Sequence, residues 1–243
     1  MNASKWFFLV MLHFGLNDSG FAQARSFRDF IIAASSKTNP TILTENFKEV
    51  GGASRFVSDV WSVGYALPKN GELISDNYQF NYDYLDKTLY LRSIETKDII
   101  AVSMNSVKKF GIVNDFGVTL HFTKVIGIDP TYPLFFEIIG GSDTSDIAIF
   151  KSKEVEYRKP NNNDYLRNFN GDYKGTYKPN EQYYLYNKSK GYRKVSSISR
   201  KDLLIYFGDS KDKVLAAFKK KKSLTDIEAK ALVTHILNHP INL

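Results

Sequence analysis

The sequence predicts a mainly β protein of the α+β class, an antiparallel meander of about eight to ten strands with a small C-terminal helical subdomain. The strands are expected to form a sandwich, a roll or a partial barrel. Three observations predict this class. Aromatic and β-branched residues alternate with polar ones in several short segments, the period of a half-buried strand. The connections are too short for helical crossovers, so the strands are antiparallel. From Ser196 onward the apolar spacing is helical.

The first strands are expected between residues 61 and 91. Large apolar residues occupy every second position of 61–67 (WSVGYAL) and of 78–84 (YQFNYDY). Asn70-Gly71 is a turn sequence because both residues tolerate positive φ at low cost. Asp86-Lys87 reverses the chain into a third strand containing Leu89 and Leu91.

The same pattern continues to residue 195. Further strands are expected at 100–104, 107–113, 116–122, 134–139, 147–157, 183–186 and 192–195. The segment 134–139 (LFFEII) is apolar on both faces apart from Glu137, which predicts a strand covered on both sides. Residues 158–180 are rich in Asn, Gly, Tyr and Lys without a clear period, and we interpret them as a long surface loop.

Three helices are expected at the C-terminal end. Ser199 with Asp202 resembles a capping box, and Gly208 is placed to end that helix in a left-handed conformation. A second helix starts near Ser210. Thr225 and Glu228 form a capping box for the third, whose apolar residues recur at helical spacing up to Leu237.

The N-terminal residues indicate export. Lys5 precedes the short apolar run 6–16, and a small-residue stretch ends at Ala24, the order found in a secretory signal peptide. Cleavage is expected before Gln23 or Arg25. The chain then divides into the leader (1–24), the β domain (25–195) and a basic three-helix subdomain (196–243), with a short helix expected at 26–34. The mature protein is expected to be periplasmic or extracellular, without a transmembrane segment.

Composition narrows the function classes. The chain contains no cysteine, which excludes disulfides, thiolate metal sites and cysteine nucleophiles. Its net charge of +7 is uneven, because residues 186–243 hold thirteen Lys and Arg against five Asp and Glu. This basic end could favour an anionic membrane surface, although solvated lysines that keep the protein soluble explain it more simply.

The sequence gives little support for nucleophilic catalysis, metal binding or phosphate binding. No serine lies in a Gly-x-Ser-x-Gly elbow. His121 lies on the polar face of its expected strand between Thr119 and Thr123, as an ordinary surface histidine would. His235 and His239 are four residues apart, but Pro240 interrupts the helix there, and histidines near a helix C-terminus are favoured by its dipole. We therefore expect no metal site and no cofactor. Nucleic-acid binding is not expected, since export removes most of that substrate.

Three sets of residues remain as functional candidates. The carboxylates Glu137, Asp143 and Asp146 could serve a glycoside-type hydrolase, although Asp143 and Asp146 lie in a typical turn sequence. The loop tyrosines Tyr165, Tyr173 and Tyr177 could contact a carbohydrate or a peptide. The run Lys219, Lys220, Lys221 and Lys222 could contact an anionic surface.

Several motifs resemble a known group of proteins. They are the Trp61-x-x-Gly64 strand, the Asn70-Gly71 turn, the segments 80–83 (FNYD) and 135–137 (FFE), the strand 183–185 (YYL) and the lysine-rich helical end. Together they resemble a group of exported proteins of Bacteroidota to which no activity is assigned. The resemblance implies a cell-envelope location and a β-rich body with a C-terminal helical piece, and it transfers no catalytic residue.

The leading hypothesis is an exported, non-catalytic module that binds an envelope protein or a carbohydrate through its sheet face and the loop 158–180. The first alternative is a carboxylate-dependent hydrolase acting on envelope or extracellular polymer. The second is a module that docks on an anionic surface through the C-terminal helices.

Overall fold

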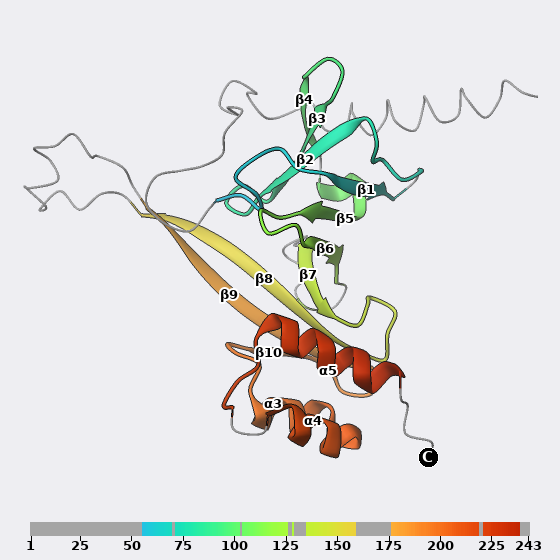
Figure 1. The fold of residues 1–243 in the computed structure, drawn as a ribbon, viewed down its shortest axis with the longest axis vertical. Coiled ribbons are helices and arrows are strands. Elements are labelled where there is room, and N and C mark those ends of the chain that lie inside the picture. The colour runs from blue at the N-terminus through green and yellow to red at the C-terminus, as the bar shows by residue number, and fades with distance from the viewer. Residues whose placement is uncertain are drawn as a thin grey trace, which may run out of the picture.

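A computed structural model gives the fold of the chain (Figure 1) and describes residues 55–69, 71–102, 104–125, 128, 135–158, 176–218 and 221–238. The expected leader and the helix expected at 26–34 lie outside these residues. The strands are β1 (Gly64–Pro68), β2 (Tyr78–Asp83), β3 (Thr88–Ser93), β4 (Ile99–Val102), β5 (Val107–Val113), β6 (Thr119–Lys124), β7 (Phe135–Gly140), β8 (Ile147–Arg158), β9 (Thr176–Asn187) and β10 (Gly191–Val195). The α-helices are α3 (Arg200–Tyr206), α4 (Lys211–Phe218) and α5 (Asp226–Asn238), and the 3₁₀ turns are η2 (Met104–Ser106) and η3 (Gly208–Ser210).

Two antiparallel sheets form the body of the protein, which confirms the predicted fold class. One sheet has seven strands in the order β1-β5-β6-β7-β8-β9-β10, and the other has three in the order β2-β3-β4. Most neighbours in each sheet are also neighbours in the chain, as a meander requires. Within the described residues neither sheet closes on itself, because β1 and β10 are the two edges of the larger one.

One strand departs from the meander. β1 pairs along its length with β5, so that Tyr65 lies opposite Gly111. The strands between them in sequence, β2 to β4, form the separate three-stranded sheet. Ser62, two residues before β1, forms an isolated bridge with Phe80 of β2, and Ala66 of β1 forms one with Ile74. The segment 62–68 therefore connects the two sheets.

The seven-stranded sheet is covered on one face, which we call the inner face. At one end the small sheet packs on it around a cluster of aromatic rings, in which Phe110 and Phe122 stack with centroids 4.7 Å apart. At the other end the three helices pack on it, around Ile149 and Leu185 of the sheet and Leu203, Val214 and Val233 of the helices. Figure 1 shows the helices below and the small sheet above.

The helices are therefore not a core of their own. Their buried residues share one cluster with residues of β7, β8, β9 and β10. α5 approaches β7 so closely that a Cβ atom at Gly140 would lie 2.9 Å from Cβ of Val233. Only a glycine leaves room for this contact without a shift of the helix.

Local sequence signals set the helix starts as predicted. The amide of Asp202 donates to Ser199 Oγ over 3.2 Å at the start of α3. At α5 the amide of Thr225 donates to Glu228 Oε2 (3.1 Å) and the amide of Glu228 donates to Thr225 Oγ1 (3.4 Å), a reciprocal capping box.

Two local predictions are wrong. Gly208 does not end α3 in a left-handed conformation, since Phe207 caps the helix at φ −115° and Gly208 begins the turn η3. The loop expected at 158–180 is also wrong at its ends, because β8 continues to Arg158 and β9 already starts at Thr176. The two strands pair over twelve residues each, with Tyr157 opposite Tyr177 at the far end.

Candidate ligand-binding face

The outer face of the seven-stranded sheet carries a group of aromatic side chains. It is opposite the helices, since side chains alternate between faces along each strand and Tyr183 and Leu185 point into the helical core. Tyr184, Tyr186 and Tyr192 lie on this face, over Phe136 and Phe150. We call these five residues the tyrosine face. Among the described residues, its cluster includes no helix residue.

Strand register brings the three tyrosines together. Tyr186 on β9 lies directly opposite Tyr192 on β10, and their ring centroids are 4.6 Å apart. Tyr184 is two residues before Tyr186, so it emerges on the same face, where its ring meets that of Phe136 edge to face at 5.1 Å. The hairpin closes through Gly191 at φ +74°, a left-handed position that suits glycine.

The phenylalanines form the floor of this face and the tyrosines its surface. Phe136 and Phe150 are 3% and 1% exposed, whereas the three tyrosines are half-buried. Within the described part of the chain, none of the three hydroxyls has a hydrogen-bond partner in the protein. Each tyrosine therefore offers a fixed ring and a hydroxyl that can bond to a ligand.

Charged groups border the tyrosine face. The ammonium of Lys194, which lies opposite Tyr184 in the β9–β10 pair, is 6.0 Å from the centroid of the Tyr184 ring. Asp143 is close enough to Tyr192 to act on its phenol. Burial raises the pKa of Tyr192, and its neighbours Tyr186 and Asp143 raise it further. The phenol is protonated at neutral pH and can donate a hydrogen bond.

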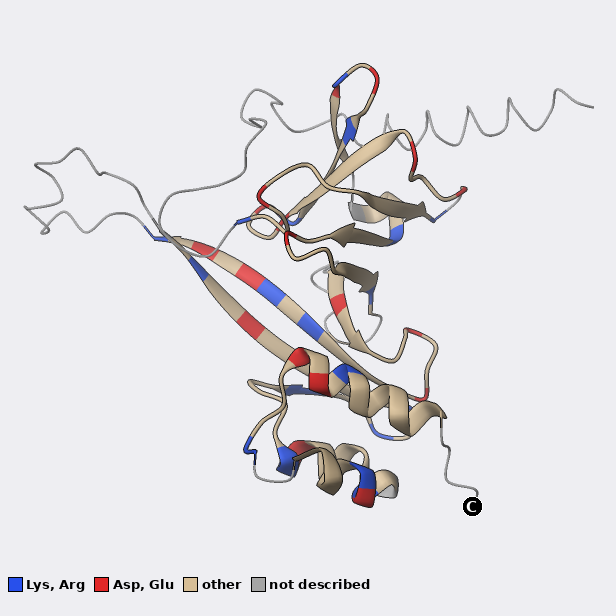
Figure 2. Cartoon of the chain, viewed as in Figure 1, with Lys and Arg blue, Asp and Glu red and all other residues tan. Residues whose placement is uncertain are grey.

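The inner face instead holds a charge network beneath α5. Lys151 Nζ on β8 contacts Asp226 Oδ2 at 2.6 Å and Glu137 Oε2 at 3.4 Å, and Tyr183 donates to Asp226 Oδ1 over 2.9 Å. Figure 2 shows the acidic start of α5 beside the charged stretch of β8 and β9. Burial lowers the pKa of Lys151, but Glu137 and Asp226 outweigh it, so the pKa is raised. The network joins the helix to three strands.

The candidate carboxylates are not gathered in one pocket among the described residues. Glu137 is 8% exposed and paired with Lys151 under the helix. Burial raises its pKa, and Lys151 opposes that increase. Asp143 and Asp146 are exposed in the β7–β8 turn, where Asp146 pairs with Lys188 at 3.0 Å. Glycoside hydrolysis needs two carboxylates facing one substrate bond, and this arrangement does not provide them.

The other predicted contact residues are spread over the chain. Tyr165, Tyr173, Lys219 and Lys220 lie outside the described residues. Tyr177 belongs to β9 rather than to a loop, and its ring lies 5.4 Å from that of Tyr157. Lys221 pairs with Glu228, and Lys222 is exposed.

The sequence predicts a binding surface on a sheet face, but Tyr184, Tyr186 and Tyr192 are not among its candidate residues. A sequence signal for the tyrosine face existed, since Tyr184 and Tyr186 are two residues apart on a strand and Tyr192 follows a five-residue turn segment. The spacing does not reveal which face of the hairpin the helices cover.

His121 has a partner that the sequence did not indicate. Its Nδ1 lies 3.0 Å from the hydroxyl of Tyr65, whose ring lies across Gly111. Burial lowers the pKa of His121, and Lys230 and Lys109 lower it further. The described residues contain no group of three or more His, Asp or Glu side chains placed to hold a metal ion.

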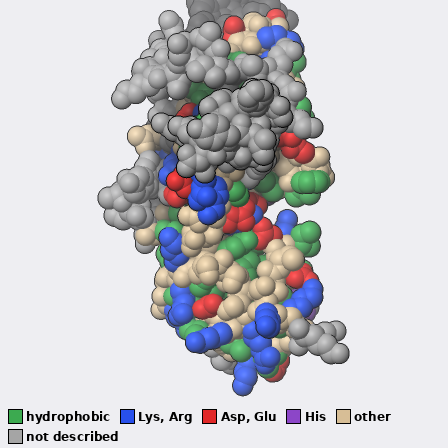
Figure 3. All heavy atoms as spheres, turned by 90° about the vertical axis from the view of Figure 1, so that its left-hand side faces the viewer, with side chains coloured by type: hydrophobic (Ala, Val, Ile, Leu, Met, Phe, Trp, Pro, Cys, Tyr) green, Lys and Arg blue, Asp and Glu red, His purple; other side chains and the backbone are tan. Residues whose placement is uncertain are grey.

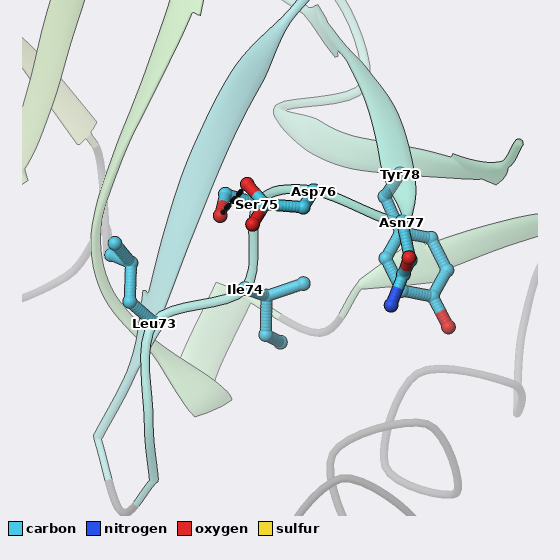
Figure 4. Close-up of a pocket in the computed structure, with 6 residues that line it drawn as sticks. All are labelled: Leu73, Ile74, Ser75, Asp76, Asn77 and Tyr78. Atoms are coloured by element: carbon cyan, nitrogen blue, oxygen red, sulfur yellow. Dashed lines mark hydrogen bonds between the residues drawn. The ribbon is translucent and has the colours of Figure 1, made fainter.

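A small hollow lies on the segment between β1 and β2. It has a volume of about 300 Å³ and is lined by Leu73, Ile74, Ser75, Asp76, Asn77 and Tyr78. Figure 4 shows that the lining residues follow one another along a single stretch of chain. Its one carboxylate, Asp76, accepts a hydrogen bond from Ser75 Oγ at 2.7 Å. Among the described residues that line it, the hollow therefore has no second acid for acid–base chemistry.

Comparison with known proteins gave no relative. No protein-family model, curated protein or solved structure matched the chain. Among the described residues, no helix is both long and apolar enough to cross a membrane. What the chain binds has to be inferred from its own residues.

Proposed function

We propose that this chain is an exported, non-catalytic binding protein of the cell envelope, and that it holds a carbohydrate chain on its tyrosine face. The observation that carries the proposal is the set of three half-buried tyrosines on one sheet face, seated on two buried phenylalanines. The leader expected at residues 1–24 supports the envelope location.

The chemistry of the face suits a sugar better than an apolar ligand. A pyranose ring has an apolar C–H side that stacks on aromatic rings and a rim of hydroxyls that form hydrogen bonds. The tyrosine face offers rings in fixed positions, hydroxyls without a hydrogen-bond partner among the described residues, and the polar groups of Lys194 and Asp143 at its border. A purely apolar ligand would leave these polar groups without water or a partner.

The rigidity of the face also supports binding rather than turnover. The tyrosines lie on β9 and β10, whose neighbour β8 pairs with β9 over twelve residues. A ligand that meets side chains already fixed by packing loses less binding energy to their ordering.

The test is retention of the purified protein by insoluble polysaccharides, namely cellulose, chitin, xylan and peptidoglycan sacculi. The triple variant Tyr184→Ala/Tyr186→Ala/Tyr192→Ala should bind the retained polymer at least about tenfold more weakly, since an aromatic contact contributes about 0.5–1.5 kcal/mol and about 1.4 kcal/mol is tenfold. Tyr157→Ala is the matched control, because Tyr157 is 45% exposed on the other face of β8.

The outcomes separate the alternatives. Retention that the triple variant loses and the control keeps supports the proposal. Retention by none of the polymers, or equal retention of the triple variant, contradicts carbohydrate binding at this face. Release of soluble sugar from any polymer would show turnover and favour the hydrolase alternative.

A further inference from the structure

Positive charge is concentrated at the helical end of the molecule. Residues 188–238 hold thirteen Lys and Arg against five Asp and Glu, whereas residues 55–125 hold eight of each. Figure 3 shows Lys and Arg side chains over the lower part of the molecule, where β10 and the helices lie. The two ends of the protein therefore differ in electrostatic potential.

Three of the five acids in this region are already bound within the protein. Asp202 pairs with Arg193 at 3.2 Å, Asp226 pairs with Lys151, and Glu228 pairs with Lys221. Lys151 belongs to the sheet, so its contact with Asp226 neutralises one carboxylate of the helical end without pairing with any cation of that end. Asp146 of the β7–β8 turn in turn pairs with Lys188 at 3.0 Å, so these two contacts offset each other and the excess of positive charge stays as the count gives it.

Two basic segments meet at one edge of the helical layer. An antiparallel bridge joins Ser199 to Ser223, and the amide of Leu224 donates to the carbonyl of Ile198 over 3.0 Å. These contacts place the start of α3 beside the link between α4 and α5. The cations of the two segments thus share one edge, which we call the basic edge: Arg200, Lys201, Lys221 and Lys222, all of them exposed.

Exposed isoleucines lie next to these cations. Ile227, in the first turn of α5, is 82% exposed, and Ile205 on α3 is 44% exposed and follows Lys201 by one helical turn. The carbonyl of Ile205 accepts a hydrogen bond from Lys190 at 2.7 Å, so a further cation lies beside it. Isoleucines beside lysines are the combination that interfacial membrane contacts use.

We infer that the basic edge docks the protein on an anionic lipid surface. Phosphate headgroups complement Arg200, Lys201 and Lys222, and Ile227 reaches the boundary between headgroups and acyl chains. A soluble polyanion would satisfy the cations but would give Ile227 nothing to contact, which is why we assign lipid. This inference does not depend on the tyrosine face, which lies on the other side of the sheet.

The test is co-sedimentation of the full protein with vesicles of phosphatidylcholine alone and of equal parts phosphatidylcholine and phosphatidylglycerol. Binding is expected only to the second and should fade as salt is added, since the attraction acts within a Debye length. The variant Arg200→Glu/Lys201→Glu/Lys222→Glu should lower partitioning at least about tenfold. It keeps Lys221, which pairs with Glu228.

The matched control is Lys69→Glu/Lys97→Glu/Lys108→Glu, which makes the same change in net charge with exposed lysines of the other end. Circular dichroism checks that both variants fold. Ile227→Ser should weaken vesicle binding while leaving the binding of soluble polyphosphate unchanged. Equal loss in both charge variants, binding to pure phosphatidylcholine, or no effect of Ile227→Ser on vesicle binding would each overturn the assignment of a lipid surface to the basic edge.

Discussion

Replacing Lys151 with methionine should destabilise the protein strongly. The ammonium joins Glu137 on β7 to Asp226 on α5, and its side chain is 11% exposed. Methionine has a similar length and is apolar, so the change removes the charge while keeping most of the packing. The variant leaves the buried carboxylate of Glu137 without its cation.

The size of the effect follows from how each carboxylate can recover. Breaking a buried ion pair by removing one partner costs about 3–5 kcal/mol. Asp226 keeps its hydrogen bond from Tyr183, and its side chain is 33% exposed, so water can hydrate it. Glu137, at 11% side-chain exposure, cannot recover in this way. We therefore expect a loss at the low end, about 3 kcal/mol.

The loss should depend on pH with a definite sign. Burial already raises the folded-state pKa of Glu137, and Lys151 lowers it, so without the lysine this pKa rises further. Below the unfolded pKa of a glutamate, about 4.3, both states are protonated and the penalty disappears. As the pH rises through the window up to the folded pKa, the unfolded state ionises first and the folded state loses stability.

Urea unfolding, monitored by intrinsic fluorescence at neutral and at acidic pH, measures the loss of stability and its pH dependence. The double variant Glu137→Gln/Lys151→Met should recover most of the loss, because it leaves no buried charge unpaired. A single variant within about 1 kcal/mol of the natural protein would refute the reasoning. So would a double variant no more stable than the single one.

Three further predictions test other parts of the structure. Gly141→Ala should cost about 1–3 kcal/mol in urea unfolding, because φ is +77° and the new Cβ would lie 2.5 Å from a carbonyl oxygen. Gly117→Ala, at φ +74° with nothing within 4 Å, should cost less, and equal losses would contradict the steric argument. Thr225→Ala should remove about 1 kcal/mol of stability by breaking the α5 capping box. The pKa of His121, measured by NMR titration, should lie below about 6.5, and Lys230→Gln should raise it. No increase would mean that Lys230 does not act on the imidazole.

Much of the fold follows from local sequence patterns. Alternation places most strands within a few residues, and the boxes at Ser199 and Thr225 set two helix starts. The strand at Thr176–Asn180 is missed, because Pro179 and the Asn, Lys and Gly residues around it are typical of a loop. It also cannot reveal that β1 pairs with β5, since that contact depends on how the two sheets pack.

The site was harder to predict for a related reason. The composition indicates a binding surface rich in tyrosine. The candidate tyrosines predicted from the sequence belong to the aromatic loop expected at 158–180. The tyrosines that gather are instead Tyr184, Tyr186 and Tyr192, because the helices cover the opposite face of their hairpin. Glu137 stands out in an apolar strand, but its role is set by Lys151 and Asp226, the latter distant in sequence.

The most direct test of the central claim is NMR of the protein with ring-labelled tyrosine, titrated with soluble oligosaccharides of the polymer that retains it. We predict that the ring signals of Tyr184, Tyr186 and Tyr192 shift together with a single binding curve, while Tyr157 on the opposite face stays unchanged. Shifts at Tyr157 without shifts on the tyrosine face would contradict the account.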